Sequence, residues 1–180
     1  MQEQDLEQLK YPISEFIKPE SLSREETDQH INVIEQLPDK LIHAVYGLMD
    51  EQLDTPYRPG GWTIRQVVHH LVDSHINSYI RFKWTLTEDN PTIKAYQEKD
   101  WAELPEAKDG PIEVSLKLLE ALHVRWCMML KNLTAEEMAK TFIHPETGQQ
   151  VRLDTNIANY AWHCELHYAH IINLKRRKGW

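Results

Sequence analysis

Apolar and polar residues follow one another along this chain with the spacing of amphipathic helices. In four long stretches the apolar positions recur every three or four residues, as the core-facing side of a helix requires. The first stretch contains Pro38, which is expected to kink or break the helix. Four long helices joined by mostly long connections are typical of an all-α four-helix bundle. The predicted helices cover residues 23–50, 62–88, 111–132 and 154–175.

The segments outside these helices carry weaker patterns. Residues 1–20 contain two prolines around an apolar pair and are expected to form an extended N-terminal arm laid on the body. The Pro and Gly content of residues 54–61 indicates a loop. Residues 89–110 have little periodicity but include aromatic residues, so we expect an ordered connection there. Two short extended runs around a Pro-Glu-Thr-Gly turn in residues 141–153 predict a β-hairpin before the last helix.

Length and charge narrow the possible partners. A chain of 180 residues is best interpreted as a single domain, 1–180, with one continuous core. Its 20 Lys and Arg against 28 Asp and Glu give a formal net charge of −8, which argues against nucleic acid or an anionic membrane surface. No apolar run approaches the roughly 20 residues that span a bilayer. The polar, acidic N-terminus and the two cysteines without CxxC spacing favour a cytoplasmic protein.

Three histidines form the main candidate site. His163 and His167 stand four residues apart in a predicted helix, which places both imidazoles on one face. His70 lies in the second predicted helix, and its neighbour His69 points about 100° away from it. Two histidines from one helix and a third from elsewhere commonly hold a transition metal with one position open. Such an open position is typical of an enzyme.

Polar lines on two otherwise apolar helices support this interpretation. A buried polar group without a partner costs about 1–3 kcal/mol, so two such lines are expected to face one another across a cleft. The alternative for any single histidine is a hydrogen-bonded structural role, but the spaced pair together with His70 favours a metal. One line contains Gln66, His70, Asp73 or Ser74, Asn77 and Arg81, and the other contains Asn156, Asn159, His163, His167 and His170.

The remaining candidates are given lesser roles. His170 continues the second line but lies nearly two turns from His163, so we expect it beside the metal ligands or on a substrate. Cys164 is off the line and suits the core, and Glu165 is rotated away and is a poor ligand or base. Surface or packing roles are expected for His30, His43, His75, His123 and His144.

The residues around these histidines resemble a known family. The run PYRPGGWTIRQVVHHLVDSHINSYIRFK, the segment YAWHCELHYAHI and the ending RRKGW closely resemble the YfiT branch of the DinB/YfiT-like superfamily, over nearly the whole chain. The resemblance implies a four-helix bundle and a metal site made by a histidine eight residues after a Trp, here Trp62 and His70, with the pair His163 and His167. It also implies one zinc or nickel ion per subunit and a homodimer. Many family members carry Gln in place of His170.

The resemblance leaves three functions open. The first is a metal-dependent hydrolase of a small molecule, with the three-histidine site activating water and with His170, Asn77, Arg81 or Asn159 orienting the substrate. The second is a low-molecular-weight thiol S-transferase, using a thiol such as bacillithiol, in which the metal holds the reactive thiolate. The third is a non-catalytic bundle that a metal stabilises.

Overall fold

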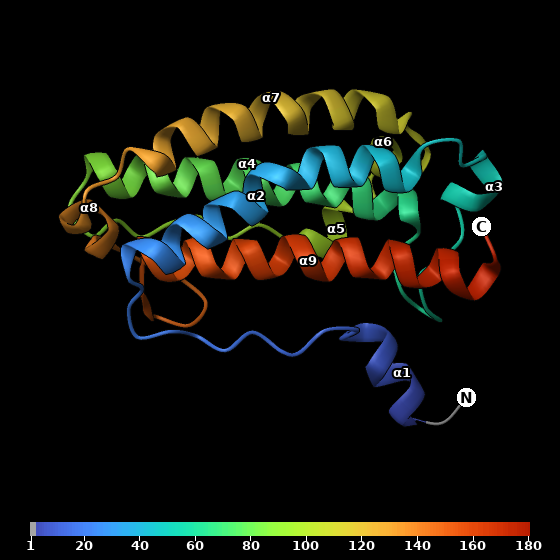
Figure 1. The fold of residues 1–180 in the computed structure, drawn as a ribbon, viewed down its shortest axis with the longest axis horizontal. Coiled ribbons are helices and arrows are strands. Elements are labelled where there is room, and N and C mark those ends of the chain that lie inside the picture. The colour runs from blue at the N-terminus through green and yellow to red at the C-terminus, as the bar shows by residue number, and fades with distance from the viewer. Residues whose placement is uncertain (1–2) are drawn as a thin grey trace.

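The computed structural model describes residues 3–180 and shows four long helices packed as a bundle (Figure 1). Helix α2 packs against α7 and α9, and α4 packs against the same two helices from the other side. The all-α four-helix bundle predicted from the periodicity is therefore confirmed. The bundle helices are α2 (Arg24–Val45), α4 (Ile64–Thr87), α7 (Ile112–Lys131) and α9 (Leu153–Lys178).

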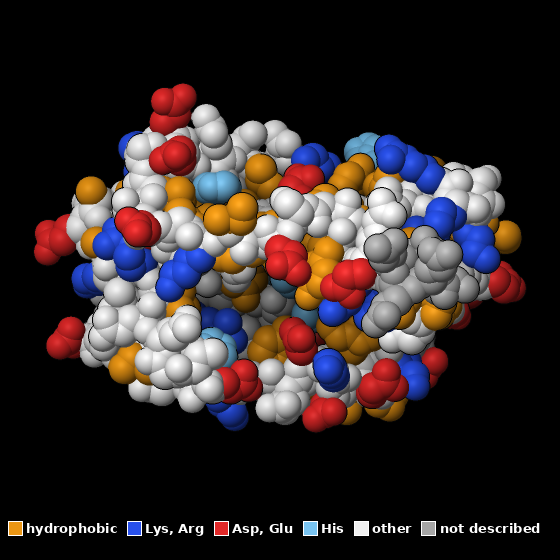
Figure 2. Space-filling view, turned by 90° about the horizontal axis from the view of Figure 1, so that it is seen from below, with side chains coloured by type: hydrophobic (Ala, Val, Ile, Leu, Met, Phe, Trp, Pro, Cys, Tyr) orange, Lys and Arg blue, Asp and Glu red, His pale blue; other side chains and the backbone are white. Residues whose placement is uncertain are grey.

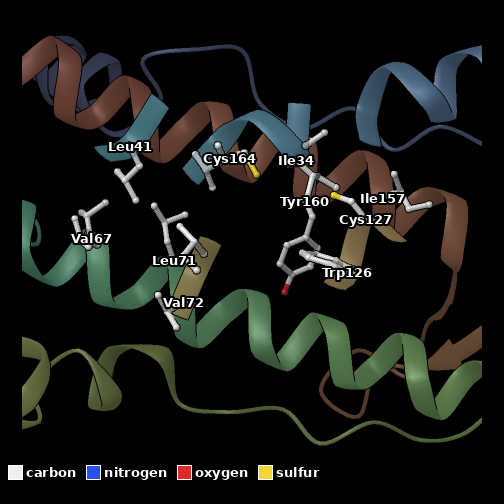
Figure 3. Close-up of a cluster of buried hydrophobic side chains, with 14 of the residues drawn as sticks. Ile34, Leu41, Val67, Leu71, Val72, Trp126, Cys127, Ile157, Tyr160 and Cys164 are labelled. Carbon is white, nitrogen blue, oxygen red and sulfur yellow. The ribbon is translucent and has the colours of Figure 1, made fainter. Parts of the chain in front are cut away.

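All four helices contribute to one apolar core. Figure 3 shows Leu41 and Leu71 toward one end of the cluster and Trp126 and Ile157 toward the other, all within the space between the helices. Each of these side chains is essentially inaccessible to water. The two cysteines are free and buried within the same core, as expected for Cys164. No helix in residues 3–180 has a sufficiently long apolar stretch to cross a membrane.

Local sequence signals set the start of α4 and the end of α9, the two helices that carry the polar lines. The Thr63 hydroxyl accepts a hydrogen bond from the Gln66 amide at 3.1 Å, and the Gln66 side chain accepts one from the Thr63 amide at 3.0 Å. This reciprocal capping box starts α4 directly after Trp62. Helix α9 ends at Gly179, whose φ of 73° is a left-handed conformation that glycine adopts without strain.

Pro38 bends α2 without breaking it. The helix is continuous from Arg24 to Val45, and its ribbon changes direction near the middle (Figure 1). Because proline has no N–H, the carbonyl of Ile34 has no helical donor four residues later. The predicted first helix is also shorter than expected, because Gly47 takes a φ of 74° and the chain turns there.

The N-terminal segment differs from the prediction of an arm that is extended throughout. Residues Glu3–Lys10 form helix α1, which ends before Tyr11 and Pro12 because a proline disfavours helical conformation in the preceding residue. From residue 11 to the start of α2 the arm is extended, as predicted. Its backbone is tied to α9 by a 2.7 Å hydrogen bond from the Trp162 indole to the Ser14 carbonyl.

The connections hold short elements that periodicity is too weak to reveal. Strands β1 (Thr141–Ile143) and β2 (Gln150–Arg152) pair antiparallel, which confirms the predicted hairpin. The connection over residues 89–110 is ordered, as expected, and crosses one face of α4. The short helices are α3 (Asp50–Leu53), α5 (Glu98–Trp101), α6 (Pro105–Asp109) and α8 (Ala135–Ala139).

Candidate metal centre

The structure brings His70, His163 and His167 together between α4 and α9. One ring nitrogen from each lies within 4.8 Å of the other two. The Nε2 atoms of His70 and His163 are 3.2 Å apart. The i, i+4 spacing places the rings of His163 and His167 one turn apart on the same face of α9, with centroids 4.4 Å apart.

These donors fit a transition metal. Two nitrogens bound at 2.0–2.1 Å to one tetrahedral ion lie about 3.4 Å apart, close to the observed separation of the His70 and His163 atoms. The Nδ1 atom of His167 is buried and has no hydrogen-bond partner in the described part of the chain. Three imidazoles leave the ion its full charge and one coordination position for a ligand from outside the protein.

Burial keeps the three rings neutral, as metal binding requires. Removal from water, together with the nearby His170, lowers the pKa of His70 to about 4. Burial and the neighbouring imidazoles hold the pKa values of His163 and His167 well below the usual range for histidine. At neutral pH each ring therefore carries one proton and offers one lone pair.

Aromatic side chains support the ligands. The indole of Trp62 packs against the ring of His70, with centroids 4.5 Å apart, and lies parallel to His167 at 6.3 Å. Elsewhere one member of each polar line contacts the facing helix through a residue outside the predicted lines. Asn156 donates to the Ser78 hydroxyl at 3.1 Å, and the Tyr160 hydroxyl donates to the Ser74 carbonyl at 3.1 Å.

A cavity of about 480 Å³ opens beside His163, and the molecular surface is hollowed near the centre of the face in Figure 2. This volume suits a small molecule. The cavity lies between α4, α9, the connection that contains α5, and the β-hairpin. Besides His163, the polar groups that line it include Arg81, Tyr96, His144, Asn159 and Tyr160.

The four expected substrate-orienting residues lie in different places. Arg81 and Asn159 line the cavity. Asn77 is not in the lining, and its amide donates to the Asp73 carbonyl of its own helix at 2.8 Å. His170 lies on the other side of the ligands, where Nε2 donates to the Lys10 carbonyl at 2.9 Å and its ring stacks on Tyr57 at 4.0 Å. Substrate contact by Arg81 and Asn159 stays a prediction that their positions favour.

The other residues weighed from the sequence lie outside the cluster. His69 faces the connection to α7, where its ring nitrogens contact Ser115 and the Gly110 carbonyl. Glu165 pairs with Lys40 at 3.1 Å and points away from the ligands. Burial raises the pKa of the Cys164 thiol well above its usual range, so this sulfur is no nucleophile at neutral pH.

The sequence interpretation missed the role of His75 and His123. Both are buried as packing residues, as expected, but they also form hydrogen bonds that lead to a metal ligand. Nε2 of His75 lies 3.2 Å from Nδ1 of His163, and Nδ1 of His75 lies 2.7 Å from Nε2 of His123. His75 is five residues after His70, a spacing that does not repeat a helix face. The contact becomes visible only once α4, α7 and α9 are packed together.

Tyr96 and His144 were also missed as residues that line the cavity, because they lie in segments without periodicity.

Comparisons with known proteins agree with this geometry. Residues 34–171 match the model of the DinB superfamily. A protein from Bacillus cereus (strain 03BB102) is 54% identical over 172 residues, covering 96% of this chain and 98% of the relative. A protein from Bacillus thuringiensis subsp. konkukian (strain 97-27) matches to the same extent. Both are named "Putative metal-dependent hydrolase".

A solved structure shows the same architecture. YfiT from Bacillus subtilis, described as "a probable metal-dependent hydrolase with an unusual four-helix bundle topology", superposes with a TM-score of 0.94 at 50% identity. The match covers 96% of this chain and 99% of YfiT. Fold, family model and relatives agree over nearly the whole chain. The protein therefore belongs to the DinB superfamily.

Proposed function

We propose that the protein is a metal-dependent hydrolase of a small-molecule substrate. The observation that carries this proposal is the position of His163, which belongs to the three-histidine cluster and also lines the cavity of about 480 Å³. A substrate in the cavity would therefore lie beside His163, one of the three residues that would hold the metal. The names of the relatives from the two Bacillus species support the same activity.

One zinc or nickel ion per subunit is the proposed cofactor, held by His70, His163 and His167. Neutral imidazoles suit both metals. When bound, such an ion lowers the pKa of water toward about 7 and polarises the oxygen of a substrate carbonyl. The cysteines among the described residues supply no thiolate nucleophile. Burial raises the pKa of the Cys127 thiol to about 12 and that of the Cys164 thiol well above its usual range.

Arg81 is the proposed anchor for a negatively charged group of the substrate. Its Nε is buried without an acceptor, and among residues 3–180 no carboxylate lies within ion-pair distance of it. A guanidinium binds a carboxylate or phosphate with two parallel hydrogen bonds. Burial raises the pKa of Tyr96, which keeps its hydroxyl a neutral donor in the same cavity. Asn159 offers an amide to a neutral polar group.

The test is metal content and turnover measured on one preparation. Metal-free protein reconstituted with zinc or nickel should bind one ion per chain and cleave activated aryl esters in the absence of any thiol. His163→Ala should lose both the metal and the turnover, because it removes one of three ligands. His43→Ala, at an exposed position on α2, is the matched control and should retain both.

Other outcomes identify the alternatives. Turnover of an electrophile that occurs only with an added low-molecular-weight thiol would overturn the hydrolase in favour of the S-transferase. A metal that raises the melting temperature but supports neither reaction would overturn both in favour of a non-catalytic bundle. The homodimer is likewise a proposal, and sedimentation of the zinc-loaded protein tests it.

A further inference from the structure

A chain of hydrogen bonds joins the metal ligand His163 to the backbone of α2. Nδ1 of His163 contacts Nε2 of His75 at 3.2 Å, and Nδ1 of His75 contacts Nε2 of His123 at 2.7 Å. Nδ1 of His123 then contacts the carbonyl oxygen of Ile34 at 2.6 Å. His75 and His123 are 0% and 2% exposed, and the two bonds that His123 makes are buried, whereas the bond from His75 to His163 is part-buried. Neither residue lines the cavity or belongs to the ligand cluster.

Pro38 explains why the Ile34 carbonyl is available. In a regular helix that oxygen would accept the N–H of the residue four positions later, which here is the imino nitrogen of Pro38. A buried carbonyl without a donor is costly. The ring of His123, on α7, supplies the donor that α2 lacks.

The Ile34 carbonyl determines which ring nitrogen carries the proton in each of the three hydrogen-bonded histidines. An oxygen of this kind only accepts, so Nδ1 of His123 must carry the hydrogen. A neutral His123 then has a lone pair on Nε2, which accepts from Nδ1–H of His75. By the same reasoning Nε2 of His75 accepts from Nδ1–H of His163. His163 is left with its lone pair on Nε2, the atom that lies 3.2 Å from Nε2 of His70.

The surroundings support neutral rings at both intermediate positions. No carboxylate in the described part of the chain lies within ion-pair distance of His75 or His123. A buried imidazolium without a counter-charge would be very unfavourable. Trp126 and Tyr160 pack edge-on against the ring of His75 and hold its plane.

We propose that His123 and His75, anchored on the Ile34 carbonyl that Pro38 leaves free, set the tautomer of His163 so that Nε2 is its metal-binding atom. The proposal rests on the metal site of the proposed function. His75 and His123 are positioning residues, since neither contacts the substrate cavity. Partners of this kind orient a ligand and raise its basicity, and losing one typically weakens metal binding about 10- to 100-fold.

The first experiment needs no variant and no metal. Long-range ¹H–¹⁵N correlation spectra of metal-free protein labelled with ¹⁵N-histidine distinguish the two neutral tautomers of each ring. His123, His75 and His163 should all show a protonated Nδ1 and an unprotonated Nε2. Protonation of Nε2 on His163 or His123 in the neutral ring would overturn the proposal.

The second experiment interrupts the series of hydrogen bonds at His123, which is not one of the proposed metal ligands. His123→Phe keeps an aromatic ring in the core but removes the link to Ile34, so His163 should show a mixture of tautomers. His75→Phe should weaken zinc binding about 10- to 100-fold in competition with a chromogenic chelator, and His123→Phe by a smaller factor in the same direction. Trp126→Phe is the matched control, because Trp126 packs against both histidines and its indole N–H has no partner among the described residues.

The Trp126→Phe control distinguishes a loss of hydrogen bonding to His163 from a general loss of packing around it. If Trp126→Phe lowers zinc affinity as much as His75→Phe does, the effect is one of packing and the proposal fails. If the wild-type protein binds no zinc or nickel, the proposed function fails, but the tautomers of the metal-free protein still decide the present proposal. If either phenylalanine variant does not fold, the wild-type spectrum alone decides it.

Discussion

Arg81 lines the cavity, and no carboxylate among residues 3–180 lies within ion-pair distance of its guanidinium. Arg65, for comparison, is held by the carboxylates of Asp50 and Asp54 at 2.7 and 2.6 Å. A guanidinium that lines a cavity without such partners is available to a ligand. If the protein is the proposed hydrolase, we therefore expect it to prefer 4-nitrophenyl hemisuccinate, which carries a carboxylate, over the neutral 4-nitrophenyl butyrate. A hydrogen bond to a charged group contributes about 1.5–3 kcal/mol, which corresponds to a preference of at least about tenfold in kcat/KM.

Substitution of Arg81 measures that preference directly. Arg81→Met should abolish the discrimination between the two esters mainly through KM for the anionic one, whereas Arg81→Lys should retain part of it. Turnover of the neutral ester should change little in both variants. Equal losses for the two esters would show instead that Arg81 supports the fold of the cavity.

Residues whose role depends on one helix were predictable, and those that depend on packing were not. The pairing of His163 with His167 follows from the pitch of a single helix. The polar line on the second predicted helix indicated that His70 would be the third member of the site. Two neighbours of the cluster are defined only by contacts across the bundle. His75 contacts the candidate ligand His163 from a position that does not share a face with His70. His170 lies beside His167, as expected, with ring centroids 5.3 Å apart, but the Lys10 carbonyl that its Nε2 contacts was not predictable.

At the scale of elements, the start of α4 sets the position of His70, a candidate metal ligand. The capping box of Thr63 and Gln66 fixes the first turn, and His70 follows two turns later. Thr63→Ala should lower the free energy of unfolding by about 1 kcal/mol, since it removes the side-chain acceptor for the Gln66 amide. Urea denaturation of the metal-free protein checks this expectation. Thr63→Ser keeps the hydroxyl and should stay near the wild type, so equal losses in the two variants would contradict the capping role.

Helix boundaries were predicted where the signal lies in the neighbouring residues. Ser23 and Glu26 form a capping box at the predicted start of α2, and Pro38 lies within the helix as a bend. The N-terminal helix α1 was missed because it is short and mostly polar, with Leu6 and Leu9 as its only apolar residues. The short helices α5 and α6 were missed because a single turn carries no measurable period. These elements matter for function, since the connection that contains α5 forms one wall of the cavity.

Across the whole molecule, six of the ten histidines are buried. Burial lowers the pKa of His123 and of His170 to about 4 and holds the pKa of His75 well below the usual range for histidine. These rings stay neutral in the folded protein, but in the unfolded chain they bind protons at their ordinary pKa near 6.5. Below pH 6.5 the unfolded state therefore binds more protons, and stability falls as the pH is lowered.

The carboxyl of Asp73 acts in the opposite direction. Burial, with a contribution from the charge of Glu106, raises its pKa to about 6. Protonation of Asp73 in the folded state therefore favours folding as the pH falls from about 6 toward 4. Asp73 is only partly buried, and it is one group against six buried histidines, so the effect of the histidines should dominate.

We therefore expect the metal-free protein to unfold between pH 6.5 and 4. A histidine whose pKa falls from 6.5 to about 4 destabilises the fold by about 3 kcal/mol below that range, and two or three such groups equal the stability of a typical domain. Far-ultraviolet circular dichroism against pH should show the transition. His170→Gln, which retains a donor for the Lys10 carbonyl, should move its midpoint to lower pH, while His43→Gln at an exposed site should not. A metal-free protein that stays folded at pH 4 would show that its buried histidines accept protons without loss of the fold.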